Sequence, residues 1–250
     1  MNEFLKAATD AARQAGSLLG EHFGKQLVVN VEEAHDIKLE LDERSQEMIT
    51  QSLQDRFPTH SVLGEEGAAH RSESDYEWVV DPIDGTVNFF YGIPHFCISI
   101  ALRRHDQLLV GVIYDPVRDE LWQASRETET LLNGVAVRVS DRRDLKTSVV
   151  SVGFSKTGPG IAAGMQTLQT MIRHARKCRM MGSAALDLAY VACGRFDAYL
   201  EQSVNWWDIA AGVVLVEQAG GKVDVEPSKI VEGKIAVIAT NGKITLPEVA

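Results

Sequence analysis

The sequence predicts a mixed α/β protein of the α+β type, and three observations support this class. Apolar side chains recur at helical spacing through residues 3–23, which predicts a long amphipathic helix. Apolar runs between residues 97 and 139 alternate with turn signals, a pattern typical of an antiparallel sheet. After residue 146, strand-like and helix-like segments alternate. We therefore expect one compact unit, with an N-terminal α+β half (residues 1–145) and a C-terminal α/β half (residues 146–250).

Composition limits the possible functions. The chain has 250 residues, 45% hydrophobic and 24% charged, as in a soluble globular protein. Its formal net charge of -10 argues against nucleic-acid binding, and it means that a phosphorylated substrate would need local cations. Cys97, Cys178 and Cys193 lack Cys-x-x-Cys spacing, so neither a disulfide framework nor a zinc site is indicated. The N-terminus lacks a signal-peptide pattern and no apolar run approaches ~18 residues, so we expect a cytoplasmic protein with no membrane partner.

The N-terminal part alternates helices with short strands. Gly24 ends the first helix, and a short strand is expected at residues 27–29. Ile37, Leu39 and Leu41 alternate as in a strand, after which Asp42 is placed to cap a helix that ends before Pro58. Asp42 is therefore either a helix cap alone or also part of a site.

Two acidic motifs follow predicted strands. Residues 61–63 form a short strand that leads into Gly64-Glu65-Glu66-Gly67. The apolar run 78–80 leads into Asp81-Pro82-Ile83-Asp84-Gly85-Thr86, where Pro and Gly predict a turn. A turn that aims both aspartates at one small volume would need a cation between them, with the Ile83 carbonyl as a further ligand and Gly85-Thr86 available to an anion. The alternative is a capped turn whose aspartates bind local amides.

The remaining strands and helices are expected in the following order. Strands are predicted at 98–102, 108–114, 120–124, 135–139, 148–154, 179–181, 196–201, 222–225 and 235–239. Helices are predicted from Ala185 to Cys193 and from Trp206 to Glu217, where Asp208 is again either a cap or a site residue.

A glycine-rich segment, residues 158–163, matches the Ala variant of the dinucleotide-binding fingerprint. No Asp or Glu occurs between Asp144 and Asp187, so the acidic residue that should bind the ribose is missing, and Pro159 removes a backbone donor. The basic residues of this acid-free stretch, Lys156 among them, are interpreted mainly as a solvated helix face. A dinucleotide-binding oxidoreductase is therefore a hypothesis that requires measurable nicotinamide affinity, and we expect none.

Together, Gly64-Glu65-Glu66, Asp81 to Thr86 and Trp207-Asp208 resemble the signatures of the inositol monophosphatase family of magnesium-dependent, lithium-sensitive phosphatases. The resemblance extends from the first helix to Gly220-Gly221. Within the family, residues 182–189 and Glu201 are most similar to the bacterial inositol-1-monophosphatase branch.

The resemblance implies a layered αβαβα sandwich of the sugar-phosphatase type, a homodimer and a role for each motif residue. It implies that Mg2+ is held by Glu65, Asp81, the Ile83 carbonyl, Asp84 and Asp208. It implies that Asp42 and Thr86 orient the attacking water, and that the substrate is bound by Gly85, Thr86, Ser183, Ala184, Glu201 and Asp208. The implied reaction is hydrolysis of myo-inositol 1-phosphate or a similar polyol or sugar phosphate by metal-activated water.

The resemblance leaves open other phosphate-ester substrates and a non-enzymatic class of protein. Enzymes with the same core act on histidinol phosphate, fructose 1,6-bisphosphate or nucleotide 3′-phosphates. The chain also departs from the family pattern, because Val31 and Lys38-Leu39 occupy places usually held by Lys and Val-Thr, and Trp206-Trp207 is bulky. The missing Lys and Thr motivate a second hypothesis, a non-catalytic binding or regulatory module. They also predict a weakened third metal site or an altered entrance, and the Trp pair predicts a reshaped alcohol pocket.

Overall fold

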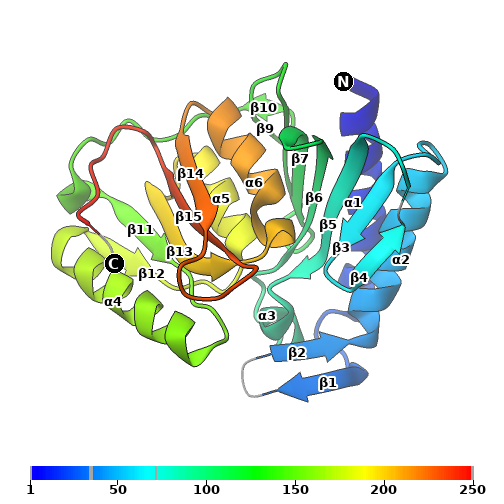
Figure 1. Ribbon diagram of the computed structural model, residues 1–250, viewed down its shortest axis with the longest axis horizontal. Coiled ribbons are helices and arrows are strands. Elements are labelled where there is room, and N and C mark those ends of the chain that lie inside the picture. The colour runs from blue at the N-terminus through cyan, green and yellow to red at the C-terminus, as the bar shows by residue number, and fades with distance from the viewer. Residues whose placement is uncertain (1, 34–35, 71, 249–250) are drawn as a thin grey trace.

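The computed structural model describes residues 2–33, 36–70 and 72–248, and its elements form five layers (Figure 1). On one outer side lie α1 (Asn2–His22) and α2 (Glu40–Gln54), which pack against an eight-stranded sheet. Helices α5 (Ala184–Ala192) and α6 (Trp206–Gln218) lie between this sheet and a five-stranded sheet. Helix α4 (Gly158–His174) covers the outer face of the second sheet. The predicted layered α/β class is confirmed.

The eight-stranded sheet has the order β10-β9-β8-β7-β6-β5-β3-β4. Its strands are β3 (Ser61–Gly64), β4 (Gly67–His70), β5 (Tyr76–Asp84), β6 (Cys97–Arg104), β7 (Gln107–Asp115), β8 (Glu120–Ser125), β9 (Leu131–Leu132) and β10 (Val135–Ala136). All neighbours are antiparallel except β3 and β5. The predicted antiparallel run is confirmed, although β10 stops at Ala136 and not at residue 139.

The five-stranded sheet has the order β12-β11-β13-β15-β14. Its strands are β11 (Val149–Val152), β12 (Lys177–Arg179), β13 (Ala198–Val204), β14 (Lys222–Pro227) and β15 (Ile235–Thr240). Strand β11 runs parallel to both of its neighbours, and β15 is antiparallel to β13 and β14. A strand was expected at 179–181, but β12 ends at Arg179.

Four smaller elements complete the described part of the chain. Strands β1 (Val29–Glu33) and β2 (Asp36–Leu39) form a separate two-stranded sheet, α3 (Thr86–Phe90) follows β5, and a 3-10 helix spans Leu145–Thr147. The strand expected to reach Leu41 ends at Leu39, because α2 begins at Glu40. Among the described residues, no helix is both long enough and apolar enough to cross a membrane.

The core is divided between the layers. One apolar cluster joins α1 and α2 to the outer face of the large sheet, with Trp78, Phe89 and Phe96 among its buried side chains. A second cluster fills the space around α5 and α6 between the two sheets. The almost uniformly apolar sequences of α5 and α6 are explained by this burial, because both helices face a sheet on each side.

Candidate active site

A β-bulge in β5 brings two aspartates to the same side of the strand. Asp81 pairs with Ser99 and Asp84 pairs with Cys97, so a step of three residues on β5 faces a step of two on β6. Side chains of a regular strand alternate, so residues three apart would point to opposite faces. The extra residue cancels that alternation and lets Pro82 lie within a strand. The turn predicted between Asp81 and Asp84 is therefore wrong, since β5 continues to Asp84.

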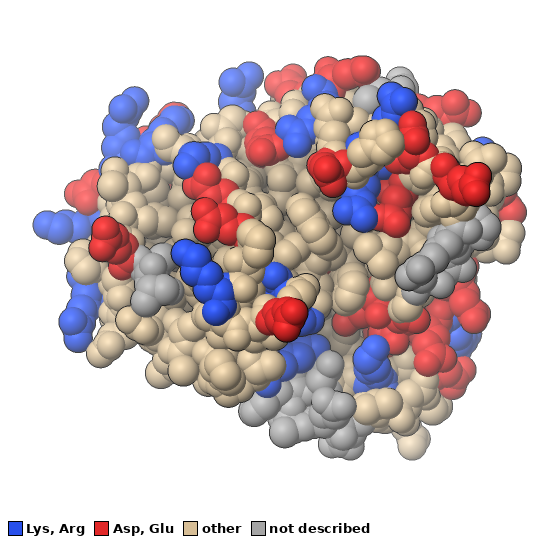
Figure 2. Space-filling view, viewed as in Figure 1, with Lys and Arg blue, Asp and Glu red and all other residues tan. Residues whose placement is uncertain are grey.

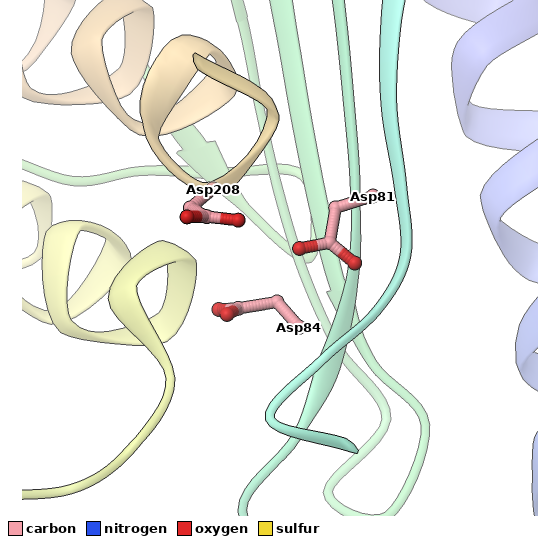
Figure 3. A group of neighbouring side chains, drawn as sticks. All are labelled: Asp81, Asp84 and Asp208. Carbon is pink, nitrogen blue, oxygen red and sulfur yellow. The ribbon is translucent and has the colours of Figure 1, made fainter. Parts of the chain in front are cut away.

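The third aspartate comes from the first turn of α6. Oxygen ligand atoms of Asp81, Asp84 and Asp208 all lie within 4.8 Å of one another, and the three carboxylates point toward a common space (Figure 3). Asn205 is the N-cap residue, and Asp208 accepts hydrogen bonds from the Asn205 backbone N–H (2.8 Å) and Nδ2 (3.2 Å). Asp208 is therefore not the N-cap itself but the acidic partner of the capping box in the first turn, and it also belongs to the acidic cluster.

Asp84 is held at the N-terminus of α5. Its Oδ2 accepts hydrogen bonds from Ser183 Oγ (2.5 Å) and the Ala185 backbone N–H (2.7 Å). Ser183 also caps α5 by accepting a hydrogen bond from the Leu186 N–H. The N-terminus of a helix favours negative charge, so the small-residue segment that begins α5 stabilises the ionised form of Asp84.

Burial and mutual repulsion raise the pKa values of these carboxyls. Burial raises the pKa of Asp84 to about 6, although the hydrogen bonds from α5 act to lower it. Burial and then the negative charge of Asp84 raise the pKa of Asp208 to about 6. Burial, followed by the charges of Glu65 and Asp84, raises the pKa of Asp81 well above its usual range. Burial and then the Asp208 charge raise that of Glu65 to about 7.

The donor set fits a hard divalent cation. The carboxylate oxygens of buried Asp81 and Asp84 and of partly buried Asp208 crowd together, where a cation would relieve their repulsion, and magnesium prefers such oxygen ligands. Figure 2 shows that Asp and Glu side chains also gather over the α2 side of the surface, which adds to the negative field. These observations favour the metal-site interpretation over a simple capped turn.

The segment after Asp84 is fixed by backbone geometry. Gly85 has φ +94, and a Cβ there would lie 3.0 Å from the His95 carbonyl oxygen. Thr86 Oγ1 donates a hydrogen bond to the Ile83 carbonyl (2.9 Å), which leaves that oxygen with a second lone pair for a ligand. Asn88, which the sequence did not single out, donates to the His95 and Met181 carbonyls and so ties α3 to the segment before α5.

A cavity of about 390 Å³ lies beside the three aspartates. The predicted site residues that line it are Glu65, Asp81, Ile83, Asp84, Gly85, Thr86, Ser183, Ala184, Glu201 and Asp208. Asp42 is not among the described lining residues. Its Oδ2 accepts a hydrogen bond from the Leu39 N–H (2.7 Å), and burial raises its pKa to about 8. The expectation that Asp42 is the N-cap is wrong, because Leu39 takes that place and Asp42 lies in the first turn.

The lining of the cavity contains residues that sequence reasoning missed. Besides Glu201, it includes Gly153, Asp187 and Tyr199. Tyr199 donates a hydrogen bond to Glu201 Oε2, and Ser151 donates to Asp187 Oδ2 (2.7 Å). Tyr199 is two positions before Glu201 on one strand, so the period of a strand was a signal that could have identified it.

Lys156 also lines the cavity, in the loop that precedes α4. Its charge acts to lower the pKa values of Glu65, Glu201 and Asp208 against the stronger effect of burial. Lys156 is exposed, as predicted, but it lies in the loop before α4 and not on the helix face that the sequence suggested. The period of the following helix could not reveal a side chain that lies before it.

The departures from the family pattern lie at different distances from the cavity. Lys38 pairs with Glu66 (3.0 Å), next to Glu65, while Val31 is 44% exposed on β1. Neither Trp206 nor Trp207 is among the described residues that line the cavity, although Asn205 and Asp208 on either side of them do, so the predicted effect of their bulk stays a prediction. Val204 and Asn205 line the cavity in this part of the chain.

Comparison with known proteins agrees with this geometry. The model of the Inositol monophosphatase family matches residues 1–250. The chain is 40% identical over 227 residues to a protein of Pasteurella multocida named Nus factor SuhB, covering 89% of this chain and 85% of that protein. It is 38% identical over 221 residues to the inositol-1-monophosphatase of Rhizobium meliloti, covering 87% and 83%.

Solved structures show the same fold. The IMPase of Thermotoga maritima superposes with a TM-score of 0.86 at 33% identity, covering 97% of this chain and 93% of that one. The inositol monophosphatase of Anabaena superposes with a TM-score of 0.83 at 35% identity, covering 97% and 92%.

Proposed function

Because the chain belongs to the inositol monophosphatase family, a family of metal-dependent phosphatases, we propose that it is a magnesium-dependent phosphomonoesterase. Its proposed substrate is myo-inositol 1-phosphate or a similar polyol or sugar phosphate. The single observation that carries this proposal is the convergence of Asp81, Asp84 and Asp208 within 4.8 Å beside a cavity of about 390 Å³.

Different residues around the cavity would bind the metal, bind the phosphate and orient the water. Asp81, Asp84, Asp208, Glu65 and the Ile83 carbonyl would hold magnesium, which supplies charge neutralisation and a water of lowered pKa when bound. Gly85 and Thr86 would bind the phosphate, and Thr86 with Asp42 would orient the attacking water. Asp42 is not among the described residues that line the cavity. To orient the water, its carboxylate would have to reach the cavity from the junction between β2 and α2.

The alcohol portion of the substrate would contact three further residues of the cavity lining. Ser183, Ala184 and Glu201 are the residues assigned to it, and all line the cavity. Glu201 offers a carboxyl group to hydroxyls, which favours a hydroxylated alcohol over a purely apolar one. Histidinol phosphate, fructose 1,6-bisphosphate and nucleotide 3′-phosphates are the alternative substrates. We further propose a cytoplasmic homodimer that lithium inhibits.

A substrate panel tests this proposal. Phosphate release should require Mg2+, stop with EDTA, and give the highest kcat/KM for myo-inositol 1-phosphate. A higher kcat/KM for histidinol phosphate, fructose 1,6-bisphosphate or a nucleotide 3′-phosphate would select that alternative. Release that continues undiminished after exhaustive chelation would contradict the metal assignment.

A second candidate is the binding or regulatory module, because several relatives are named Nus factor SuhB. This chain would then serve as a Nus factor, with or without hydrolysis. Absence of turnover on every ester of the panel, despite Mg2+ binding measured by calorimetry, would favour this candidate.

A further inference from the structure

The Glu201 carboxyl is fixed by a buried tyrosine. Tyr199 and Glu201 lie two residues apart on β13, so both side chains project from the same face of the sheet. The Tyr199 hydroxyl donates a hydrogen bond of 2.5 Å to Glu201 Oε2, and only 1% of Tyr199 is exposed. Among the described residues, no second hydrogen-bond donor to the Glu201 carboxyl is found, although the charge of Lys156 also acts on it. Tyr199 therefore sets the direction of the carboxyl and leaves Oε1 available to a ligand.

Gly153 provides the space in which this pair lies. Strands β11 and β13 are parallel, with Val152 opposite Leu200, and the Gly153 N–H donates to the Leu200 carbonyl (2.9 Å). A Cβ on Gly153 would lie 1.9 Å from Glu201 Oε2 and 2.8 Å from the Tyr199 hydroxyl. Gly153 is not among the glycines with positive φ, so its backbone conformation does not require glycine. The close approach of the Glu201 carboxyl does.

We propose that Tyr199 and Gly153 are positioning residues that hold Glu201 against the hydroxyl groups of the substrate alcohol. They would thereby determine the preference of the site for hydroxylated leaving groups. This inference rests on the proposed phosphatase function and adds to it the means by which the alcohol is selected. A carboxyl held in one rotamer binds a hydroxyl at lower entropic cost than a mobile one.

Two substrates separate this role from a general effect on the enzyme. myo-Inositol 1-phosphate has hydroxyls beside the ester, whereas p-nitrophenyl phosphate has none. Loss of one hydrogen bond that orients the carboxyl should lower kcat/KM about tenfold more for the inositol ester than for the nitrophenyl ester in Y199F. The loss should appear mainly in KM. The control is Y91F, because Tyr91 is 66% exposed and does not line the cavity.

The glycine is tested by adding a methyl group. G153A should shift the ratio of the two substrates in the same direction as Y199F, because the new Cβ displaces the Glu201 carboxyl. The matched control is G158A, since a Cβ at Gly158 meets nothing within 4 Å. Replacing Glu201 by aspartate shortens the side chain and moves its carboxyl away from Gly153. G153A should therefore have a smaller effect in an E201D background than in the wild-type background.

The outcomes are distinct. Parallel losses on both substrates in Y199F, or an equal effect of G153A in both backgrounds, would overturn the positioning role and leave the phosphatase proposal intact. A wild-type protein that cleaves neither ester in Mg2+ would overturn the proposed function and this inference with it. If G153A does not fold, as checked by thermal unfolding, Y199F alone decides.

Discussion

The two walls of the cavity differ in how their buried carboxyls are satisfied. In the three-aspartate wall (Asp81, Asp84 and Asp208), carboxylate oxygens lie within 4.8 Å of one another. In the glutamate wall (Asp187 and Glu201), each carboxyl has its own hydroxyl donor, Ser151 or Tyr199. The three-aspartate wall therefore combines hydrogen bonds with close like charges, whereas the glutamate wall has one hydroxyl donor for each carboxyl.

The pKa values follow this difference. Burial is the largest cause of the upward shift in both walls. Asp84, with a hydroxyl and a backbone N–H as donors, has its pKa raised only to about 6, whereas that of Glu201, with one tyrosine donor, is raised to about 8. Asp187 has its pKa raised well above the usual range, mainly by burial. Burial raises the pKa in both walls, and the additional hydrogen-bond donor to Asp84 limits the shift there.

The largest expected effect comes from removing one member of the three-aspartate wall. D84N keeps an acceptor for the Ala185 N–H but removes the negative charge. Because a catalytic metal contributes several kcal/mol, we expect kcat/KM with Mg2+ to fall about 10³-fold. Phosphate release measures this. D106N, at an exposed hairpin position, is the control, and a D84N enzyme with full activity would refute the assignment.

A smaller effect is expected from the serine that supports Asp84. S183A removes a hydrogen bond to the carboxylate and the cap of α5, so Mg2+ affinity should fall at least about tenfold and stability by about 1 kcal/mol. Calorimetry and chemical denaturation measure the two quantities. T157A, which removes the cap of α4, should cost similar stability without changing metal affinity. Equal Mg2+ affinities in S183A and T157A would show that Ser183 does not support metal binding.

The third prediction concerns how the stability of the metal-free protein changes with each pH unit. The pKa values of Asp84, Asp208, Glu65 and Glu201 are higher in the folded protein (about 6, 6, 7 and 8) than the usual carboxyl values near 4. A raised folded-state pKa gives stability that is complete below the unfolded value and is lost as the pH rises through the folded value. Stability should therefore fall between about pH 4 and 8, by about 1 kcal/mol per pH unit wherever the folded protein holds one proton more than the unfolded chain.

Magnesium should distinguish the two walls in this experiment. Saturating Mg2+ should restore most of the stability lost through the three-aspartate wall and Glu65, while the loss that follows Glu201 should persist. Thermal unfolding from pH 5 to 8, with and without Mg2+, measures both. A pH profile that Mg2+ does not change would contradict the difference between the walls.

Much of the fold could be predicted from local patterns. The helical spacing of residues 3–23 gave α1, observed as Asn2–His22, and the alternating runs gave the antiparallel strands β6 to β8. Boundaries were less accurate where competing local interactions decide them. Leu41 fits a strand by alternation but lies in α2, because the Asp42 carboxylate binds the Leu39 N–H and starts the helix earlier.

The sequence by itself determined the chemical content of the site, since the acidic motifs, their order and Glu201 are all readable along the chain. Only the tertiary structure decided how they meet. The bulge in β5 aligns Asp81 with Asp84, α5 supplies donors to Asp84, and Gly153 makes room for Glu201 from a neighbouring strand. These contacts join residues far apart in the chain, and local periodicity carries no information about which distant backbone approaches a side chain.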